Sequence, residues 1–195
     1  MKLTKHISKG IFFFAILFFS SFSVVQSQEY NLSNSDSELK VYGTSNVHDW
    51  EINANEQSGV IDLIYSNELE INKLKIVIPA ESLKSGKGGM DKNTYKALKT
   101  DKYKNITFSL TEIKSSTRLG DQKYKVKALG NLTISGVTKN VSIDFNLDIN
   151  SNTIHIVGEK SIKMTDFNVE PPTALFGSIT TGDEITIKFK TKFKK

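Results

Sequence analysis

The stretch Val141-Ser142-Ile143-Asp144-Phe145-Asn146-Leu147-Asp148-Ile149 alternates apolar and polar residues without a break, and this alternation decides the fold class. Successive side chains of a β-strand point to opposite faces of the sheet, so the stretch is predicted to form a strand with one buried and one solvated face. The C-terminal run 185–194 repeats the pattern, with isoleucine and phenylalanine alternating mainly with lysine. We interpret these lysines as the solvated face of a strand, where they also protect a sheet edge from pairing.

Further runs along the chain have the same strand-like character. They cover residues 39–47, 49–55, 59–65, 69–78, 105–113, 124–134 and 153–164. Turn residues separate them at 56–58, 66–67, 119–121, 135–136 and 150–152. Within the run 69–78 the apolar parity changes between Ile71 and Leu74, which indicates a bulge or a turn there.

One segment, 91–100, has helical spacing instead. Tyr95 and Leu98 share a face, and Asp91 is expected to cap the first turn. About eight antiparallel strands with a single helix indicate an all-β domain, either a sandwich or a closed up-and-down barrel. Alternation fits both architectures. A sandwich fills itself, whereas an eight-stranded barrel holds side chains or one small ligand.

The N-terminal 27 residues are predicted to be a secretory signal peptide. Lysines precede an apolar run at 11–19, and small and polar residues follow it. As a helix this run spans about 13 Å, far less than the roughly 30 Å of a bilayer core, so no transmembrane segment is expected in the mature chain. Residues 28–38 are polar and are predicted to be a flexible segment that leads into a domain at 39–195. Export without any cysteine favours a bacterial periplasmic or secreted protein.

The charge of the chain is concentrated in its leader. The whole sequence has 26 basic and 21 acidic residues, a net charge of +5, but three of the lysines fall within residues 1–27. The remainder therefore carries +2, and a nucleic-acid partner is not expected.

The sequence contains no pattern that predicts catalysis. The lack of cysteine excludes a thiol nucleophile and a zinc ribbon. The glycine-rich loop 85–89 lacks the spacing of a phosphate-binding loop, and no G-x-S-x-G or HExxH motif is present. Asp144 and Asp148 share a strand face, but it is the polar one. We therefore expect a non-enzymatic protein without catalytic residues, a metal site or a cofactor.

A polar and aromatic cluster at 43–50 connects two of the predicted strands. It contains His48 and Trp50. One interpretation is a structural turn in which Asn46 or Asp49 bonds the backbone and Trp50 packs inward. The other is that His48 contacts a ligand.

The sequence from about Leu39 to Lys194 resembles the YceI-like family, exported lipocalin-like proteins described as polyisoprenoid-binding. The resemblance rests mainly on Gly136-Val137-Thr138-Lys139-Asn140-Val141 after Leu132-Thr133-Ile134, which matches the LTI-x-GVTK-x-V hairpin of that family. It also rests on Ile106-Thr107-Phe108 after a helical segment that begins with Met90-Asp91. His48 and Trp50 fall where early strands of the family place a histidine and an aromatic residue.

Two positions depart from the family pattern. Where the family has Arg-x-Asp-Phe-Gly, this chain has Met164-Thr165-Asp166-Phe167-Asn168, and Tyr103-Lys104-Asn105 replaces the usual Tyr-Pro before Ile-Thr-Phe. Without that arginine, a polar head-group contact at this place has no support. The resemblance implies an antiparallel eight-stranded lipocalin-like up-and-down β-barrel with one short helix.

The resemblance further implies that the barrel pore binds a long-chain isoprenoid or other amphiphilic lipid. Alternatives are a structural or stress-related interaction protein with a filled barrel, and an accessory of membrane quinone or electron-transfer chemistry. Residues of the apolar strand parity, together with groups near the strand ends, are the candidates for ligand binding. They are His48, Trp50, Phe108, Leu110, Phe145, Leu147, Phe167, Ile185, Ile187 and Phe189. Parity does not separate ligand contact from packing. The sequence leaves the oligomeric state open.

Overall fold

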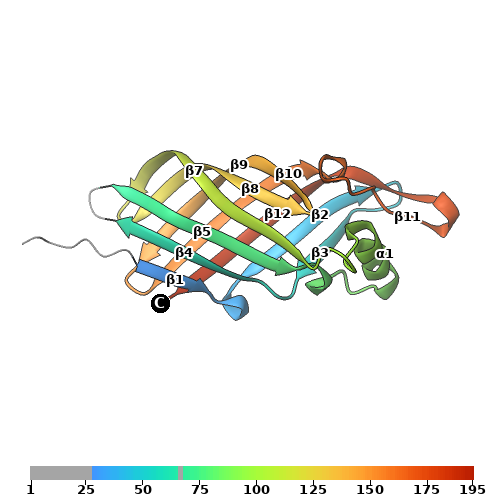
Figure 1. Cartoon of the computed structure of the whole chain (residues 1–195), viewed down its shortest axis with the longest axis horizontal. Coiled ribbons are helices and arrows are strands. Elements are labelled where there is room, and N and C mark those ends of the chain that lie inside the picture. Colours follow the sequence, from blue (N-terminus) through green and yellow to red (C-terminus); the bar gives the residue numbers. More distant parts are fainter. Residues whose placement is uncertain (1–27, 66–67) are drawn as a thin grey trace, which may run out of the picture.

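Eight strands close into an antiparallel barrel in the computed structural model of the protein, which describes residues 28–65 and 68–195 (Figure 1). The described residues form twelve strands in all, eight of which make up the closed ring: β1 (Gln28–Leu32), β2 (Glu38–Ser45), β3 (Trp50–Ala54), β4 (Ser58–Tyr65), β5 (Leu69–Pro79), β6 (Leu83–Lys84), β7 (Asn105–Gly120), β8 (Lys123–Ile134), β9 (Val137–Asn150), β10 (Thr153–Lys163), β11 (Thr173–Ala174) and β12 (Ile179–Lys194). The predicted signal peptide 1–27 and the predicted turn 66–67 lie outside the described residues.

The ring runs β1-β4-β5-β7-β8-β9-β10-β12 and closes where β12 pairs with β1. Strands β2 and β3 extend it toward the other end, because β2 also pairs with β12 and β3 pairs with β2. β1 and β2 are thus the two halves of one strand that is interrupted once. β3 and β4 are likewise the two halves of the neighbouring strand. The Asn34 side chain joins the interruptions: its Nδ2 donates to the Asn55 carbonyl at 3.0 Å, and its Oδ1 accepts from the Gln57 N–H at 2.8 Å. The predicted barrel is confirmed.

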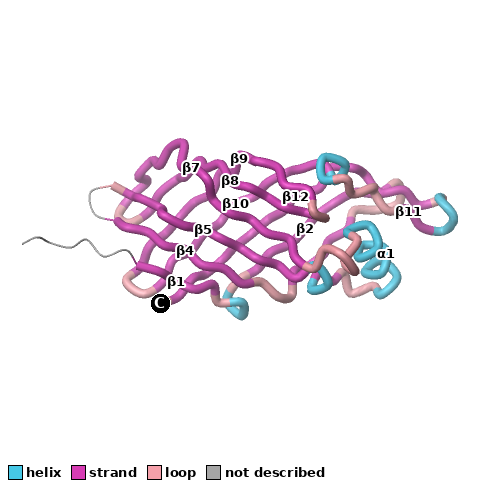
Figure 2. Tube along the Cα trace, in the orientation of Figure 1, coloured by secondary structure: helices cyan, strands magenta, loops and turns pink. Residues whose placement is uncertain are grey.

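Helical segments gather at one end of this barrel. Helix α1 (Gly88–Leu98) and the 3-10 turns η2 (Ala80–Ser82), η3 (Met164–Phe167) and η4 (Leu175–Gly177) lie toward that end, while η1 (Asn34–Asp36) lies along the side (Figure 2). No helix among the described residues is long and apolar enough to cross a membrane.

The alternation predicted for the strands is confirmed by burial and by pairing. In β9, Phe145, Leu147 and Ile149 are buried. The intervening Asp144 and Asp148 face outward, where they pair with lysines of β8 at 4.0 and 3.1 Å. The parity change after Ile71 is a bulge, since the β4–β5 register shifts at this point.

Two local predictions are wrong. Residues 28–38 are not a flexible segment: β1 pairs with β4 and β12, and the Tyr30 side chain has an exposed fraction of 0%. Helix α1 begins at Gly88 rather than at Asp91, and Asp91 does not cap it. Its carboxylate instead accepts hydrogen bonds from the Ser85 N–H at 2.8 Å and the Ser85 hydroxyl at 2.6 Å.

The two halves of the barrel differ in how they are filled. In the half near the C-terminus, which we call the filled half, large side chains from nearly every strand meet at the axis. They include Tyr30, Ile61, Leu63, Val126, Leu147, Ile149, Ile154 and Phe193, all with exposed fractions of 0 or 1%. The other half, toward α1, has a second apolar cluster that surrounds a cavity, and we call it the hollow half.

Candidate functional site

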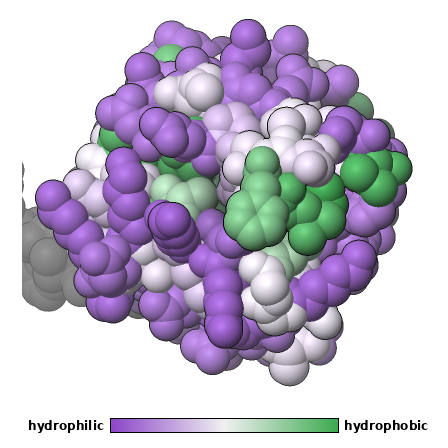
Figure 3. Space-filling model, turned by 90° about the vertical axis from the view of Figure 1, so that its right-hand side faces the viewer, coloured by the Kyte–Doolittle hydropathy of each residue, from purple (hydrophilic) through white to green (hydrophobic). Residues whose placement is uncertain are grey.

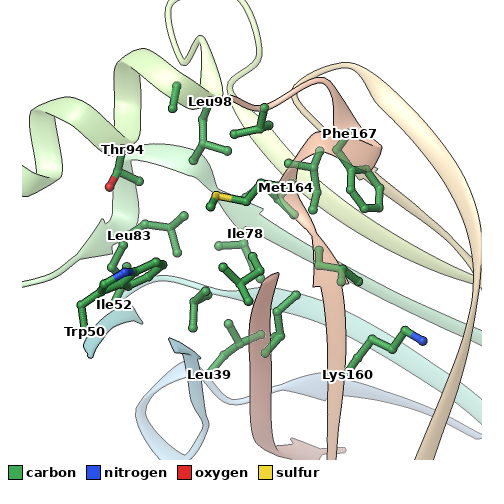
Figure 4. A pocket seen from close by; sticks show the side chains of 18 of the residues that line it. Leu39, Trp50, Ile52, Ile78, Leu83, Thr94, Leu98, Lys160, Met164 and Phe167 are labelled. Carbon is green, nitrogen blue, oxygen red and sulfur yellow. The ribbon is translucent and has the colours of Figure 1, made fainter. Parts of the chain in front are cut away.

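A cavity of about 740 Å³ occupies the hollow half of the barrel. This volume is within the roughly 300–1,000 Å³ typical of small-molecule sites. Apolar side chains from β2, β3, β5, β8, β10 and β12 line its walls, and Figure 4 shows several of them pointing toward a common centre. The barrel is therefore not filled by its own side chains throughout.

The floor of the cavity is the upper surface of the filled half. Phe145 and Ile156 belong to the filled cluster and also line the cavity. Phe145 has an exposed fraction of 3% and Ile156 of 2%. The rings of Phe108 and Phe189 pack on the glycines Gly130 and Gly158 of neighbouring strands, where a Cβ atom would collide with them. These glycines let large rings lie against the wall instead of crossing the pore.

Helix α1 covers the opposite side of the cavity. It presents Met90, Thr94 and Leu98 inward, and Figure 4 shows Thr94 and Leu98 directed at the cavity. Tyr95, three residues before Leu98 on α1, does not line the cavity, and its hydroxyl bonds carbonyls of the 81–83 segment at 3.0 and 2.9 Å. The Asp91–Ser85 bonds hold the loop before α1 against the helix. They also lower the pKa of Asp91, chiefly through the Ser85 hydroxyl and then through its N–H.

His48 and Trp50 lie at the mouth. The turn is fixed mainly by Ser45, whose hydroxyl donates to the His48 carbonyl at 2.7 Å and accepts from the His48 N–H at 3.1 Å. Trp50 Nε1 donates to the Thr44 carbonyl at 2.9 Å, and its ring packs on Gly43. Both side chains line the cavity while the turn is structural, so the two interpretations of this cluster are compatible.

Most of the ten predicted site residues lie together around this cavity. The residues that line it are His48, Trp50, Phe108, Phe145, Phe167, Ile185, Ile187 and Phe189. The other two, Leu110 and Leu147, do not. Leu147 is buried at the axis of the filled half, and Leu110 packs against that same half beside a small groove between β5 and β7. They have the right strand parity but the wrong position along the barrel.

Lys160 is a cavity residue that the sequence reasoning missed. It follows Ile156 and Gly158 and precedes Ile162 on the inward parity of β10, so a lysine at an apolar position was the available signal. Lys160 is half-buried, and its side chain has no ion-pair or hydrogen-bond partner among the described residues. The β9–β10 ladder ends at the Asp144–Glu159 pair, so no β9 partner covers β10 beside Lys160. The Lys160 amine points away from the apolar side chains at the centre of the cavity (Figure 4).

The charged side chains around the cavity are all positive. Its charged lining residues in the described chain are Lys87, Lys92 and Lys160, and no aspartate or glutamate lines it. Lys87 and Lys92 lie at the α1 rim, whereas Lys160 lies in the wall. The site can therefore hold a long apolar group and meet a negatively charged one.

An eight-stranded antiparallel barrel with a filled half and an apolar cavity defines a lipocalin-like binding fold. The sequence matches the YceI-like domain over residues 30–193. The protein therefore belongs to the YceI-like family, and the match begins within the segment that was predicted to be flexible. No curated protein matches the chain.

Solved structures share this fold at low sequence identity. BcnA of Burkholderia cenocepacia has a TM-score of 0.67 at 20% identity, covering 83% of this chain and 98% of BcnA. A polyisoprenoid binding domain from Saccharophagus degradans, implicated in plant cell wall breakdown, has a TM-score of 0.68 at 16% identity, covering 85% and 97%. The YceI protein of Campylobacter jejuni has a TM-score of 0.55 at 23% identity, covering 72% and 82%.

The boundary between the two halves can be tested with two phenylalanines. Phe145→Ala should lower the free energy of unfolding by about 3–5 kcal/mol, because it opens a void in the filled half. Phe108→Ala should cost only about 1–2 kcal/mol, because the Phe108 ring is only half-buried and lies along the wall on Gly130, whereas Phe145 is 3% exposed. Urea unfolding of the two variants measures the difference. Equal losses would contradict the division into a filled and a hollow half.

The Asp91–Ser85 contact predicts a pH effect. Because the folded chain favours the carboxylate, this contribution to stability is complete above the ordinary pKa of 3.8 and is lost as the pH falls through the lowered value. NMR titration of Asp91 should therefore give a pKa below 3.8, and Ser85→Ala should raise it. Replacing the exposed Ser142 by alanine should leave it unchanged. An ordinary pKa in the unsubstituted protein would contradict this contact.

Proposed function

We propose that the protein is an exported, non-enzymatic carrier that holds a long-chain isoprenoid or similar amphiphile in the cavity of the hollow half. The observation that carries this proposal is an apolar cavity of about 740 Å³ closed below by packed side chains and covered by α1. Burial of apolar surface contributes about 25 cal/mol per Å². A chain of many carbons therefore gains affinity from burial without a directed polar contact.

The charges at the site favour an amphiphile with an anionic head group. Lys160 is a half-buried cation whose side chain lines the cavity without an ion-pair partner among the described residues, so an anionic head group beside the wall would gain a charge-assisted contact. The wall also has Met164 where the YceI-like pattern has arginine, and Met164 lines the cavity two inward positions beyond Lys160. Lys160 supplies a positive charge on the same face of the chain, displaced along β10 from the place of the missing arginine.

The likeness to the polyisoprenoid binding domain of Saccharophagus degradans supports the choice of ligand class. Export is proposed from the predicted signal peptide at 1–27. Fatty acids and other chains of similar length would use the same apolar wall, so the cargo is defined here by its long chain and its anionic end.

Native mass spectrometry of the protein purified from its own host tests the proposal. The spectrum should contain a species heavier than the mature chain by the mass of one amphiphile. Extraction with organic solvent should release that amphiphile, and the extracted protein should then have only the mass of the mature chain. If the protein is reproducibly empty under gentle desolvation, and also fails to take up added prenyl lipids, the proposal is wrong.

The role of Lys160 can be tested with two ligands that differ only in their end. Geranylgeranyl phosphate should bind more tightly than geranylgeraniol, and fluorescence of Trp50, the one tryptophan of the chain, can report binding because it lines the cavity. Lys160→Gln should weaken phosphate binding about tenfold or more, since a charge-assisted hydrogen bond is lost. It should leave the alcohol unaffected.

Lys190→Gln is the matched control. Lys190 lies on the outer face of β12 and is exposed, so its loss changes the net charge equally without touching the cavity. An identical effect of both substitutions would show that the preference comes from the overall charge of the protein and not from Lys160.

A further inference from the structure

We propose that the open end of the barrel docks on the surface of a lipid bilayer that contains anionic phospholipids. The contact is made by an exposed group of side chains, Val47, Leu175 and Phe176, which we call the apolar tip. Val47 lies in the loop between β2 and β3, and the other two lie in η4 between β11 and β12.

Exposure of large apolar side chains is concentrated at this end. Among the described residues, five large apolar side chains are exposed, and three of them form the apolar tip. Their exposed fractions are 61% for Val47, 68% for Leu175 and 111% for Phe176. Viewed from this end, the molecule shows a group of apolar residues surrounded by hydrophilic ones (Figure 3). Single exposed apolar residues are common on proteins, but a rimmed group marks an interaction surface.

The two loops of the apolar tip are joined into one unit by Asn46. Its Nδ2 donates to the Ser178 carbonyl at 2.9 Å, and its Oδ1 accepts from the Thr180 N–H at 3.0 Å. Its own N–H donates to the Thr180 carbonyl at 3.1 Å. The three side chains are therefore presented together by bonded loops.

The backbone of η4 directs Phe176 outward at a conformational cost. Leu175 and Phe176 have φ values of 48° and 56°, the left-handed region that bulky residues avoid, and Gly177 follows at 91°. Ala174 and Ile179, on either side of η4, line the cavity. The chain next to Phe176 therefore faces the apolar interior, whereas Phe176 itself faces solvent. Strain of this kind persists where it serves a function, and here it keeps a phenylalanine in solvent.

The same end of the molecule carries a basic segment. Residues 84–104, which contain α1, hold seven lysines and two aspartates, a net charge of +5, while the rest of 28–195 has a net charge of −3. Helix α1 and β11 lie at the same end (Figure 1). Lysines near an anionic leaflet are attracted to it, and apolar side chains then insert at the interface. Asp49 and Glu170, the acids nearest the apolar tip in sequence, oppose this attraction. Insertion of the apolar tip therefore supplies most of the binding free energy.

The apolar tip adjoins the mouth of the cavity. Ser45 and His48 on one loop, and Ala174 and Ile179 on the other, all line the cavity. A long-chain amphiphile could then pass between the leaflet and the cavity without crossing water. This last step rests on the proposed function, whereas docking does not.

Because the chain has no cysteine, single labelling sites can be introduced for the test. Phe176→Cys should carry a nitrobenzoxadiazole dye that becomes brighter and blue-shifted with vesicles of phosphatidylcholine and phosphatidylglycerol. Leu119→Cys is the control, because Leu119 is also an exposed apolar residue, at 60%, and lies near the end of β7, at the filled end of the barrel. Its dye should not respond. No response at 176, or the same response at both positions, would overturn the proposal.

Vesicle flotation of unlabelled protein gives a second readout. The double variant Leu175→Ser/Phe176→Ser should bind about tenfold or more weakly than the unsubstituted protein, and Leu119→Ser should bind equally well. Replacing Lys92, Lys96 and Lys99 by glutamine should weaken binding only to vesicles that contain phosphatidylglycerol. Equal binding by the double variant overturns the proposal, as does a tip-dependent dimer that binds no vesicles. If the protein binds vesicles but its cavity is empty, the proposed carrier function is wrong and the proposed docking surface stands.

Discussion

Closure of the sheet between β1 and β12 gives the barrel its interior. Its ladder is short, joining Asn31 with Lys194 and Leu32 with Phe193, and it is extended by the bond from the Ser33 N–H to the Lys192 carbonyl at 2.8 Å. The Asp36 carboxylate pairs with Lys194 at 2.6 Å, and hydrogen bonds from Lys194 and then Ser33 lower the pKa of Asp36 to about 2. Closure turns one face of every strand toward an interior, where Phe193 packs with an exposed fraction of 0%.

The division of that interior into two halves produces the site. Side chains such as Leu147 and Val126 fill the axis at the end where the ring closes, and this packing supplies a rigid floor. Toward the other end, the wall is extended by β2 and β3, glycines accept the rings of Phe108 and Phe189, and α1 covers the interior without filling it. The same alternating pattern thus stabilises one half and leaves a binding volume in the other.

Much of the architecture could be predicted from the sequence, because alternation is a local signal. The strand around Phe145, its polar face with Asp144 and an irregularity after Ile71, either a bulge or a turn, all follow from parity alone. Parity specifies a face and not a height along the barrel, so it placed Leu147 among the cavity residues although it lies in the filled half. Burial of Tyr30 depends on pairing with distant strands, which a polar local sequence did not reveal. Lys160 was detectable as an inward lysine, but only once the parity of β10 was followed through Gly158.

A crystal structure of the protein purified from its own host would show whether the hollow half contains a ligand. We expect continuous elongated electron density in the hollow half, running from the floor at Phe145 past Lys160 toward the mouth at His48 and Trp50. The filled half should contain none. A hollow half in which Met90, Met164 and Phe189 have moved together and closed the cavity would refute ligand binding inside the barrel, because no volume for a ligand would then remain.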